Sequence, residues 1–117
     1  MLLLFAAAAL LAVAILVPAQ AMTPAVLKGE VGPGFTIEVT KGGKDVKSLK
    51  AGKYTIKVED KSASHNFRLK GPGGINKATT VPFKGKKTWT VTLKKGKYTY
   101  QCDPHASSGM KDTFTVK

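Results

Sequence analysis

The stretch Tyr98-Thr-Tyr-Gln-Cys102-Asp-Pro-His105-Ala-Ser-Ser-Gly-Met110 joins a strand pattern to a reversal of the chain. Alternation places Tyr98, Tyr100 and Cys102 on one face, which we predict to be the core face of a β-strand. Pro104 ends that strand because proline cannot donate a ladder hydrogen bond. Gly109 can take a positive φ, which lets the chain turn back before a last strand begins.

Outside this stretch, short runs with a two-residue period alternate with Gly, Pro, Asp and Ser. Such runs predict strands whose apolar members face the core. We expect strands at 25–31, 35–40, 53–59, 65–70, 87–93, 97–102 and 113–117. Their inward residues are expected to include Phe35, Ile37, Val39, Tyr54, Ile56, Val58, Trp89, Val91 and Leu93. About seven strands and no convincing amphipathic helix predict an all-β fold, a Greek-key antiparallel β-sandwich.

The first 21 residues are predicted to be a signal peptide rather than part of this domain. Residues 2–17 are apolar without a break, Pro18 follows, and Ala19-Gln20-Ala21 is a small-x-small cleavage motif. An uncleaved membrane anchor is the alternative, because no Lys or Arg precedes the run and a span needs only about 20 apolar residues. Residues 22–117 then form one domain, which we expect in the periplasm or outside the cell.

The charge of the chain is strongly positive, with 19 Lys or Arg against 7 Asp or Glu and a net charge of +12. Arg68 is the only arginine, whereas nucleic-acid readers favour arginines and stacking aromatic rings, so we expect no nucleic-acid partner. A soluble, lysine-rich surface is one interpretation. Steering toward an acidic or membrane-bound redox partner, or toward an anionic membrane surface, is the other. We expect a monomer.

Four residues with metal-binding side chains occur in one pattern. Cys102, His105 and Met110 lie within nine positions, and the second histidine, His65, lies upstream in Ser64-His65-Asn66-Phe67. A thiolate, two imidazoles and a thioether are the ligands expected of a copper electron-transfer site. Each residue taken alone is more often a buried structural residue, but a lone cysteine in an exported chain needs an explanation. Period two places His65 on the core face of its predicted strand.

The spacing Cys102-x-x-His105-x-x-x-x-Met110 resembles the copper loop of plastocyanin-like cupredoxins, in a small, prokaryotic-type form. The segment around His65 resembles the family's first histidine and the asparagine after it. The resemblance implies one type 1 (blue) copper per chain, bound by His65, Cys102, His105 and Met110. It also implies that Asn66 ties two loops together around the site. Asp103 stands where plastocyanins commonly have a neutral hydroxyl residue.

The function predicted from this site is one-electron transfer by Cu(I)/Cu(II) cycling. We expect no enzyme activity, because the site has no open coordination position and no nearby general base. His105 is the expected exit for the electron, with Pro104 and Ala106 in the contact patch around it. A copper carrier or storage protein is the alternative. Two further alternatives are an enzyme and a purely structural domain. An enzyme that used Cys102 as nucleophile and His105 as base would lack a third group to orient the base.

Overall fold

The computed structural model of the chain describes residues 8–14 and 23–117. Residues 8–14 are exposed and form no regular structure. The rest of the predicted signal peptide, including its cleavage motif, lies outside the described residues. No helix in the described part of the chain is long and apolar enough to cross a membrane.

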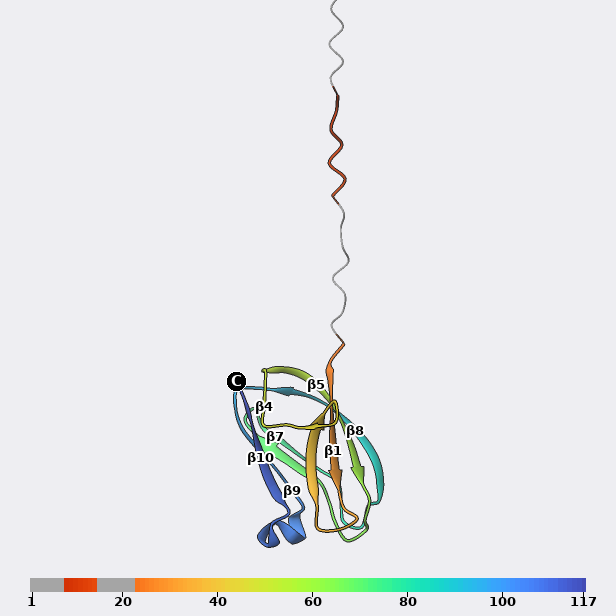
Figure 1. Ribbon diagram of the computed structural model, residues 1–117, viewed down its shortest axis with the longest axis vertical. Helices are drawn as coiled ribbons and strands as arrows, with labels where there is room; N and C mark the ends of the chain where they lie inside the picture. Colours follow the sequence, from red (N-terminus) through yellow and green to blue (C-terminus); the bar gives the residue numbers. More distant parts are fainter. Residues whose placement is uncertain (1–7, 15–22) are drawn as a thin grey trace, which may run out of the picture.

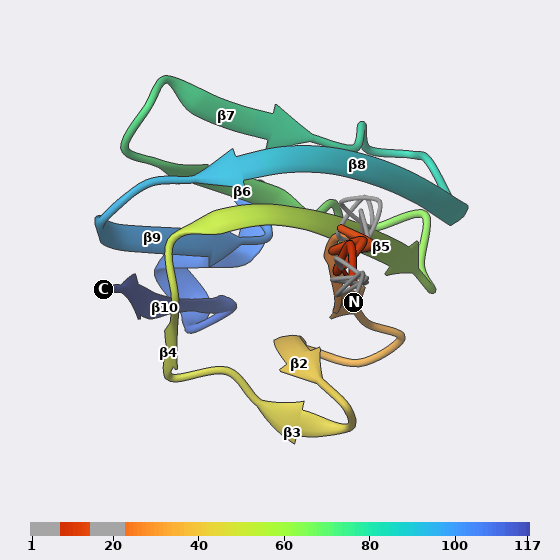
Figure 2. The same cartoon turned by 90° about the horizontal axis from the view of Figure 1, so that it is seen from above.

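Two five-stranded sheets form the domain, and they pack face to face (Figures 1 and 2). The strand order of the first sheet is β3-β2-β1-β5-β8, and that of the second sheet is β4-β10-β9-β6-β7. The elements are β1 (Ala25–Val31), β2 (Ile37–Lys41), β3 (Lys44–Asp45), β4 (Ser48–Leu49), β5 (Gly52–Asp60), β6 (Arg68–Gly71), β7 (Ile75–Ala78), β8 (Gly85–Leu93), β9 (Gly96–Gln101), a 3-10 helix η1 (Asp103–Ser108) and β10 (Lys111–Val116).

The predicted all-β sandwich is confirmed, but both sheets are mixed rather than purely antiparallel. β1 pairs with β5 in parallel, and β10 pairs with β4 in parallel. The chain leaves the first sheet after β3, adds β4 to the second sheet and returns for β5, so β4 can pair with β10 and β5 with β1. Parallel pairs of this kind need such crossover connections. Three short strands account for the larger strand number: β3 and β4 have two residues each and β7 has four, too few to show a periodicity.

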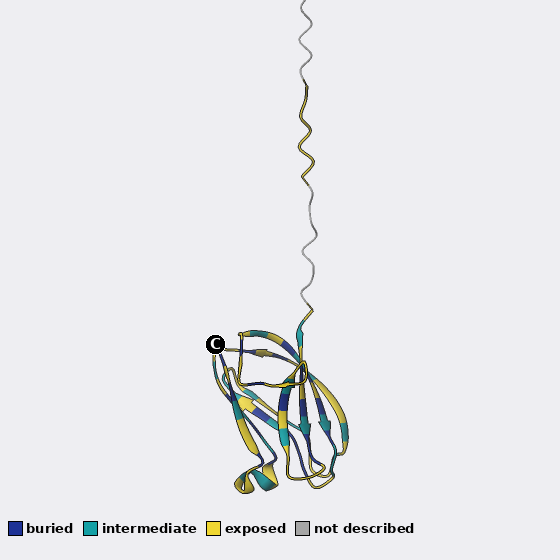
Figure 3. Cartoon of the chain, in the orientation of Figure 1, coloured by how far each residue is buried: buried dark blue, intermediate teal, exposed yellow. Residues whose placement is uncertain are grey.

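Alternation of buried and exposed side chains runs along most strands (Figure 3). In β5, Tyr54, Ile56 and Val58 are buried as predicted. Trp89 in β8 is only partly buried and packs against the edge of the core. The prediction is wrong for Phe35, whose side chain is 68% exposed, because β2 begins only at Ile37 and the pleat of a strand does not extend to Phe35.

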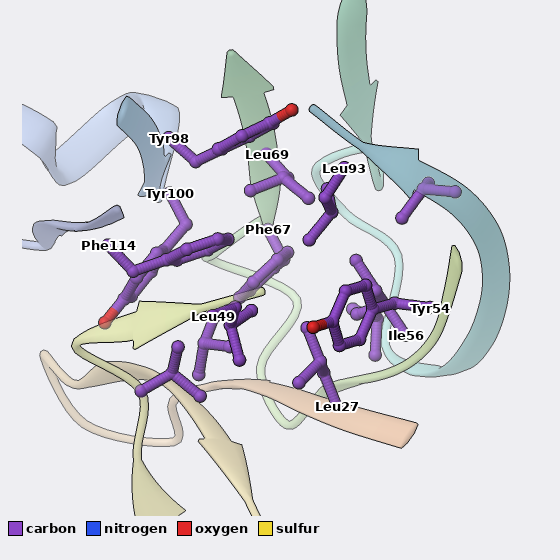
Figure 4. Packing of buried hydrophobic residues seen from close by; sticks show 14 of the residues in the cluster. Leu27, Leu49, Tyr54, Ile56, Phe67, Leu69, Leu93, Tyr98, Tyr100 and Phe114 are labelled. Carbon is purple, nitrogen blue, oxygen red and sulfur yellow. The ribbon is translucent and has the colours of Figure 1, made fainter. Parts of the chain in front are cut away.

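The centre of the sandwich is aromatic (Figure 4). Tyr98 and Phe114 stack with ring centroids 5.4 Å apart, and Phe67 and Tyr100 stack at 6.1 Å. Stacked pairs of this kind contribute about 0.5–1.5 kcal/mol beyond the area that they bury. The stack joins β9 to β10 and to the chain just before β6, which are the segments that flank the predicted metal ligands. Core packing therefore fixes the ends of these segments.

Candidate metal centre

Three of the predicted ligands come from the short connection between β9 and β10. Cys102 directly follows β9, and the helix η1 then carries His105 within a single turn. Pro104 lies at the helix start, where the missing N–H of proline has no cost. The connection therefore begins at a strand that is anchored in the core, and its first ligand, Cys102, is fully buried.

Backbone hydrogen bonds close this connection on itself. The Cys102 N–H donates to the Met110 carbonyl at 3.0 Å, and the Met110 N–H donates to the His105 carbonyl at 3.2 Å. The His105 N–H donates back to the Cys102 carbonyl at 3.1 Å. Gly109 has a φ of 101° and reverses the chain as predicted. The backbone of all three predicted ligands is thus interlocked before any metal is considered.

His65 reaches the same place from a different loop, which connects β5 to β6. It was predicted to lie on a strand, but β6 begins only at Arg68, so this expectation is wrong. The imidazole is nevertheless buried, with 3% of the residue exposed. Gly32 makes room for it: a Cβ at that position would lie 3.0 Å from His65 Cδ2, and the φ of Gly32 is +76°. The turn after β1 therefore needs glycine on both counts.

The ligand atoms of His65, Cys102 and His105 converge on one point. The two Nδ1 atoms are 2.9 Å apart, and Cys102 Sγ lies 3.7 Å from Nδ1 of His65 and 3.5 Å from Nδ1 of His105. A metal ion bound at about 2.0 Å from nitrogen and about 2.3 Å from sulfur spans ligand separations of this size. A thiolate and two imidazoles, facing one another in this way, suit copper.

Comparisons with known proteins identify the family. The family described as "Copper binding proteins, plastocyanin/azurin family" matches residues 35–117, which include the whole convergent site. The chain belongs to this family. It is a cupredoxin with a type 1 copper centre. Comparison with curated proteins finds no match in sequence.

Solved structures of other cupredoxins share the fold. A rusticyanin structure is 23% identical with a TM-score of 0.60, over 79% of this chain and 76% of that one. Reduced rusticyanin is 26% identical with a TM-score of 0.55, over 79% and 78%. Reduced auracyanin from the photosynthetic bacterium Roseiflexus castenholzii is 19% identical with a TM-score of 0.58, over 82% and 99%.

Met110 is the fourth predicted ligand of the cupredoxin site. Its side chain is buried, with 1% of the residue exposed. Its backbone is hydrogen-bonded to both Cys102 and His105, so the residue is fixed beside the other two predicted ligands of this connection. Its role as the axial ligand stays a prediction.

Asn66 and Asp103 join the two ligand loops by a reciprocal pair of hydrogen bonds. The Asp103 N–H donates to Asn66 Oδ1 at 2.6 Å, and Asn66 Nδ2 donates to Asp103 Oδ2 at 2.8 Å. Asn66 Nδ2 also donates to the carbonyl of buried Thr79 at 3.2 Å. These residues follow His65 and Cys102 directly, so the bridge sets the position of one loop relative to the other.

Arg68 is a residue of this network that the sequence pattern missed. Its Nε lies 2.9 Å from both carboxylate oxygens of Asp103, and Nη2 lies 2.9 Å from Oδ2. Gln101 Nε2 donates to the same carboxylate at 3.0 Å. The guanidinium, followed by Gln101 and Asn66, lowers the pKa of Asp103 to about 2, against the cost of burial. The unusual carboxylate of the loop is therefore neutralised by the only arginine of the chain, three residues after His65.

Phe35 is the second residue that sequence reasoning misplaced. Its exposed ring meets both imidazoles edge-on, with centroids 4.8 Å from His105 and 5.6 Å from His65. It follows the Gly32-Pro33-Gly34 turn at the same end of the sandwich. No periodicity could have found this contact, because the turn, and not a strand, directs the side chain.

Proposed function

We propose that this cupredoxin is an exported one-electron carrier that cycles between Cu(I) and Cu(II) and catalyses no reaction of its own. Bound copper supplies a centre that accepts and releases a single electron. The observation that supports this function is the convergence of His65, Cys102 and His105 on one point. Ligands whose backbone is fixed by hydrogen bonds need little rearrangement when the charge of the site changes, and little rearrangement favours fast electron transfer.

The surrounding structure supports transfer rather than substrate chemistry. Cys102 and His65 are buried, whereas His105 is only partly buried. Burial keeps water from these two ligands. We propose that Met110 is the weak axial ligand and that the site is closed on that side.

The electron then leaves through His105. Pro104 is exposed and Ala106 is partly exposed beside it, and the exposed ring of Phe35 lies against the same imidazole. Together, Pro104, His105, Ala106 and Phe35 form what we call the apolar end patch. We propose that a redox partner docks on this patch, where a short path leads to copper.

Export is supported by the sequence of residues 1–21, with its apolar run and its small-x-small motif. The domain at 22–117 would act in the periplasm or outside the cell, either released or held at the membrane by the uncleaved segment. N-terminal sequencing of the protein recovered from the exported fraction distinguishes the two, because cleavage after Ala21 leaves Met22 as the first residue.

The function is tested by loading the protein with Cu(II) and cycling it with ascorbate and an oxidant. We expect an intense blue thiolate-to-copper absorption that is bleached and restored over many cycles without loss of copper. Rapid transfer of the copper to a chelator such as bathocuproine would instead indicate a copper carrier. A colourless copper-loaded protein would contradict the proposal outright.

The apolar end patch is tested by Ala106→Asp. We expect slower electron exchange with a macromolecular redox partner and an unchanged copper absorption spectrum, because the charge is placed on the contact surface and not among the ligands. Unchanged exchange kinetics would show that the partner docks elsewhere.

A further inference from the structure

The two sheets carry very different charge on their outer faces. In the first sheet, pairing places Lys28, Lys53, Lys57 and Lys86 outward together with Glu30, Glu38 and Glu59. Lys28 lies 2.9 Å from a carboxylate oxygen of Glu30 and 3.7 Å from one of Glu59. The charges of this face therefore nearly balance within the face itself.

The outer face of the second sheet has no such balance. Its rows combine Lys70, Lys97, Lys111 and Arg68 with threonine, glutamine and asparagine. No aspartate or glutamate occupies an outward position of β6, β7, β9 or β10 among the described residues. We call this surface the basic face.

Asp103 borders the basic face and is paired with Arg68. Asp112 of β10 is exposed, but it has the register of inward-facing Tyr100 and does not lie in the outward rows. Lys70, Lys97 and Lys111 are exposed and form no ion pair in the described part of the chain. Unpaired lysines on one side of a protein produce a potential that attracts anionic surfaces and speeds their encounter.

The basic face also lies next to the copper ligands. One of its rows runs from Lys111 through Gln101 to Arg68. Lys111 follows Met110 and Gln101 precedes Cys102, so this row ends where the ligand loop begins. Arg68 then connects the row to Asp103 at the start of η1. The basic face is therefore continuous with the apolar end patch.

We infer that the partner of this cupredoxin is an acidic redox protein whose footprint extends from the apolar end patch onto the basic face. This inference rests on the proposed electron-transfer function and names the chemistry and the position of its partner. Threonine side chains between the lysines make the face polar, as suits a brief encounter rather than a permanent complex. The nearly neutral face of the first sheet takes no part in docking.

Two triple variants with the same loss of charge test this inference. Lys70→Gln, Lys97→Gln and Lys111→Gln remove three lysines from the basic face, and Lys53→Gln, Lys57→Gln and Lys86→Gln remove three from the first sheet. Electron exchange of the copper-loaded proteins with an acidic c-type cytochrome is followed by stopped-flow at about 10 mM ionic strength, where charges act over about 30 Å. We expect the rate constant to fall about tenfold for the basic-face variant and less than about twofold for the other. The difference should disappear near 1 M salt.

Equal slowing of both variants would show that net charge alone matters and would overturn the inference. Binding to vesicles of phosphatidylcholine and phosphatidylserine provides a second outcome. If the basic-face variant loses vesicle binding but exchanges electrons normally, the face contacts a membrane and the inference is wrong.

Two further measurements separate failure of this inference from failure of the proposed function. Reduction of both variants by hydroquinone, a small neutral reductant, should proceed at the wild-type rate, since it reports only on the copper site. Amide shifts of the isotope-labelled protein on addition of polyglutamate report docking without any redox step. We expect shifts at Lys70, Thr99 and Lys111 and none at Lys57 or Thr90; the reverse pattern would overturn the inference even if copper cycling failed.

Discussion

The two loops that build the copper site are held in different ways. The connection that carries Cys102, His105 and Met110 is closed by hydrogen bonds between its own residues. The loop that carries His65 also has hydrogen bonds of its own, such as that from the His65 N–H to the Ser62 carbonyl at 3.2 Å, but it depends in addition on distant parts of the chain. It needs space beside Gly32, and its Asn66 bonds to Asp103 and to the carbonyl of Thr79.

This difference suggests how the site responds to damage. A change of Cys102, His105 or Met110 in the self-closed connection removes a ligand directly, whereas a change far away in sequence can displace His65 without touching any ligand. The comparison predicts a graded series of effects, in which the residues around the His65 loop behave as positioning residues.

The largest effect is expected for Cys102→Ser, because a hydroxyl does not replace the soft thiolate on which blue copper depends. The thiolate-to-copper absorption should be lost completely in the optical spectrum. Ser107→Ala, on the exposed side of η1, is the matched control and should keep the colour. A blue Cys102→Ser protein would contradict the assigned site.

Gly32→Ala should have the next largest effect on the copper site and tests the dependence of His65 on a distant turn. The alanine is strained at a φ of +76° and its Cβ would meet the imidazole, so we expect a loss of about 1–2 kcal/mol in stability and weaker copper binding.

Gly42→Ala provides the control for Gly32→Ala. Gly42 also has a positive φ, 57°, but a Cβ there would meet nothing within 4 Å. It should cost similar stability in denaturant unfolding and leave copper affinity unchanged. Equal copper affinity in the two variants would show that Gly32 does not position His65.

Asn66→Ala should remove the bridge between the loops and cost about 1–3 kcal/mol, since it leaves the Asp103 N–H and the Thr79 carbonyl without their partner. We also expect a shifted copper absorption band and a changed reduction potential, measured by redox titration. Asn76→Ala, which removes only an exposed contact with Arg68, should leave both nearly unchanged. If the two variants behave alike, the bridge has no effect on the metal.

The smallest effect is expected for Asp60→Asn, at the entrance of the His65 loop. Asp60 Oδ1 accepts the Ser62 N–H at 3.0 Å, while Oδ2 has no partner among the described residues. Burial raises the pKa of Asp60 above its ordinary value of 3.8, although the Ser62 N–H and His65 act in the other direction. The ionised carboxylate therefore lowers the free energy of unfolding at a pH above that raised pKa. It has no effect on the free energy of unfolding at a pH below 3.8, where the group is protonated in both the folded and the unfolded chain.

Thermal unfolding as a function of pH checks this sign. Asp60→Asn should melt a few degrees higher than the wild type at pH 7 and at the same temperature near pH 3. A variant that is less stable at pH 7 would show that the charge is compensated in the fold.

Much of the site was predictable from the sequence because its chemistry is local. The alternation of Tyr98, Tyr100 and Cys102 identified the inward face of β9, and the spacing of Cys102, His105 and Met110 identified the loop. The prediction failed where a turn, and not a strand, sets the direction of a side chain. Phe35 lies outside β2 and faces the imidazoles, and His65 lies before β6 rather than on it. The mixed sheets were also missed, since the pairing of distant strands within a sheet leaves no pattern in the chain.

The sequence by itself determined the sandwich, its inward residues on the long strands, and the four residues able to bind copper. These features can be read from the alternation of apolar and polar side chains and from the chemistry of single residues, both of which are visible within a few positions of the sequence. Only the tertiary structure decided that His65 and Cys102, 37 positions apart, face one another, that Arg68 neutralises Asp103, and that one sheet is basic while the other is balanced. Each of these results from which strands become neighbours, and that choice is made by packing the whole core.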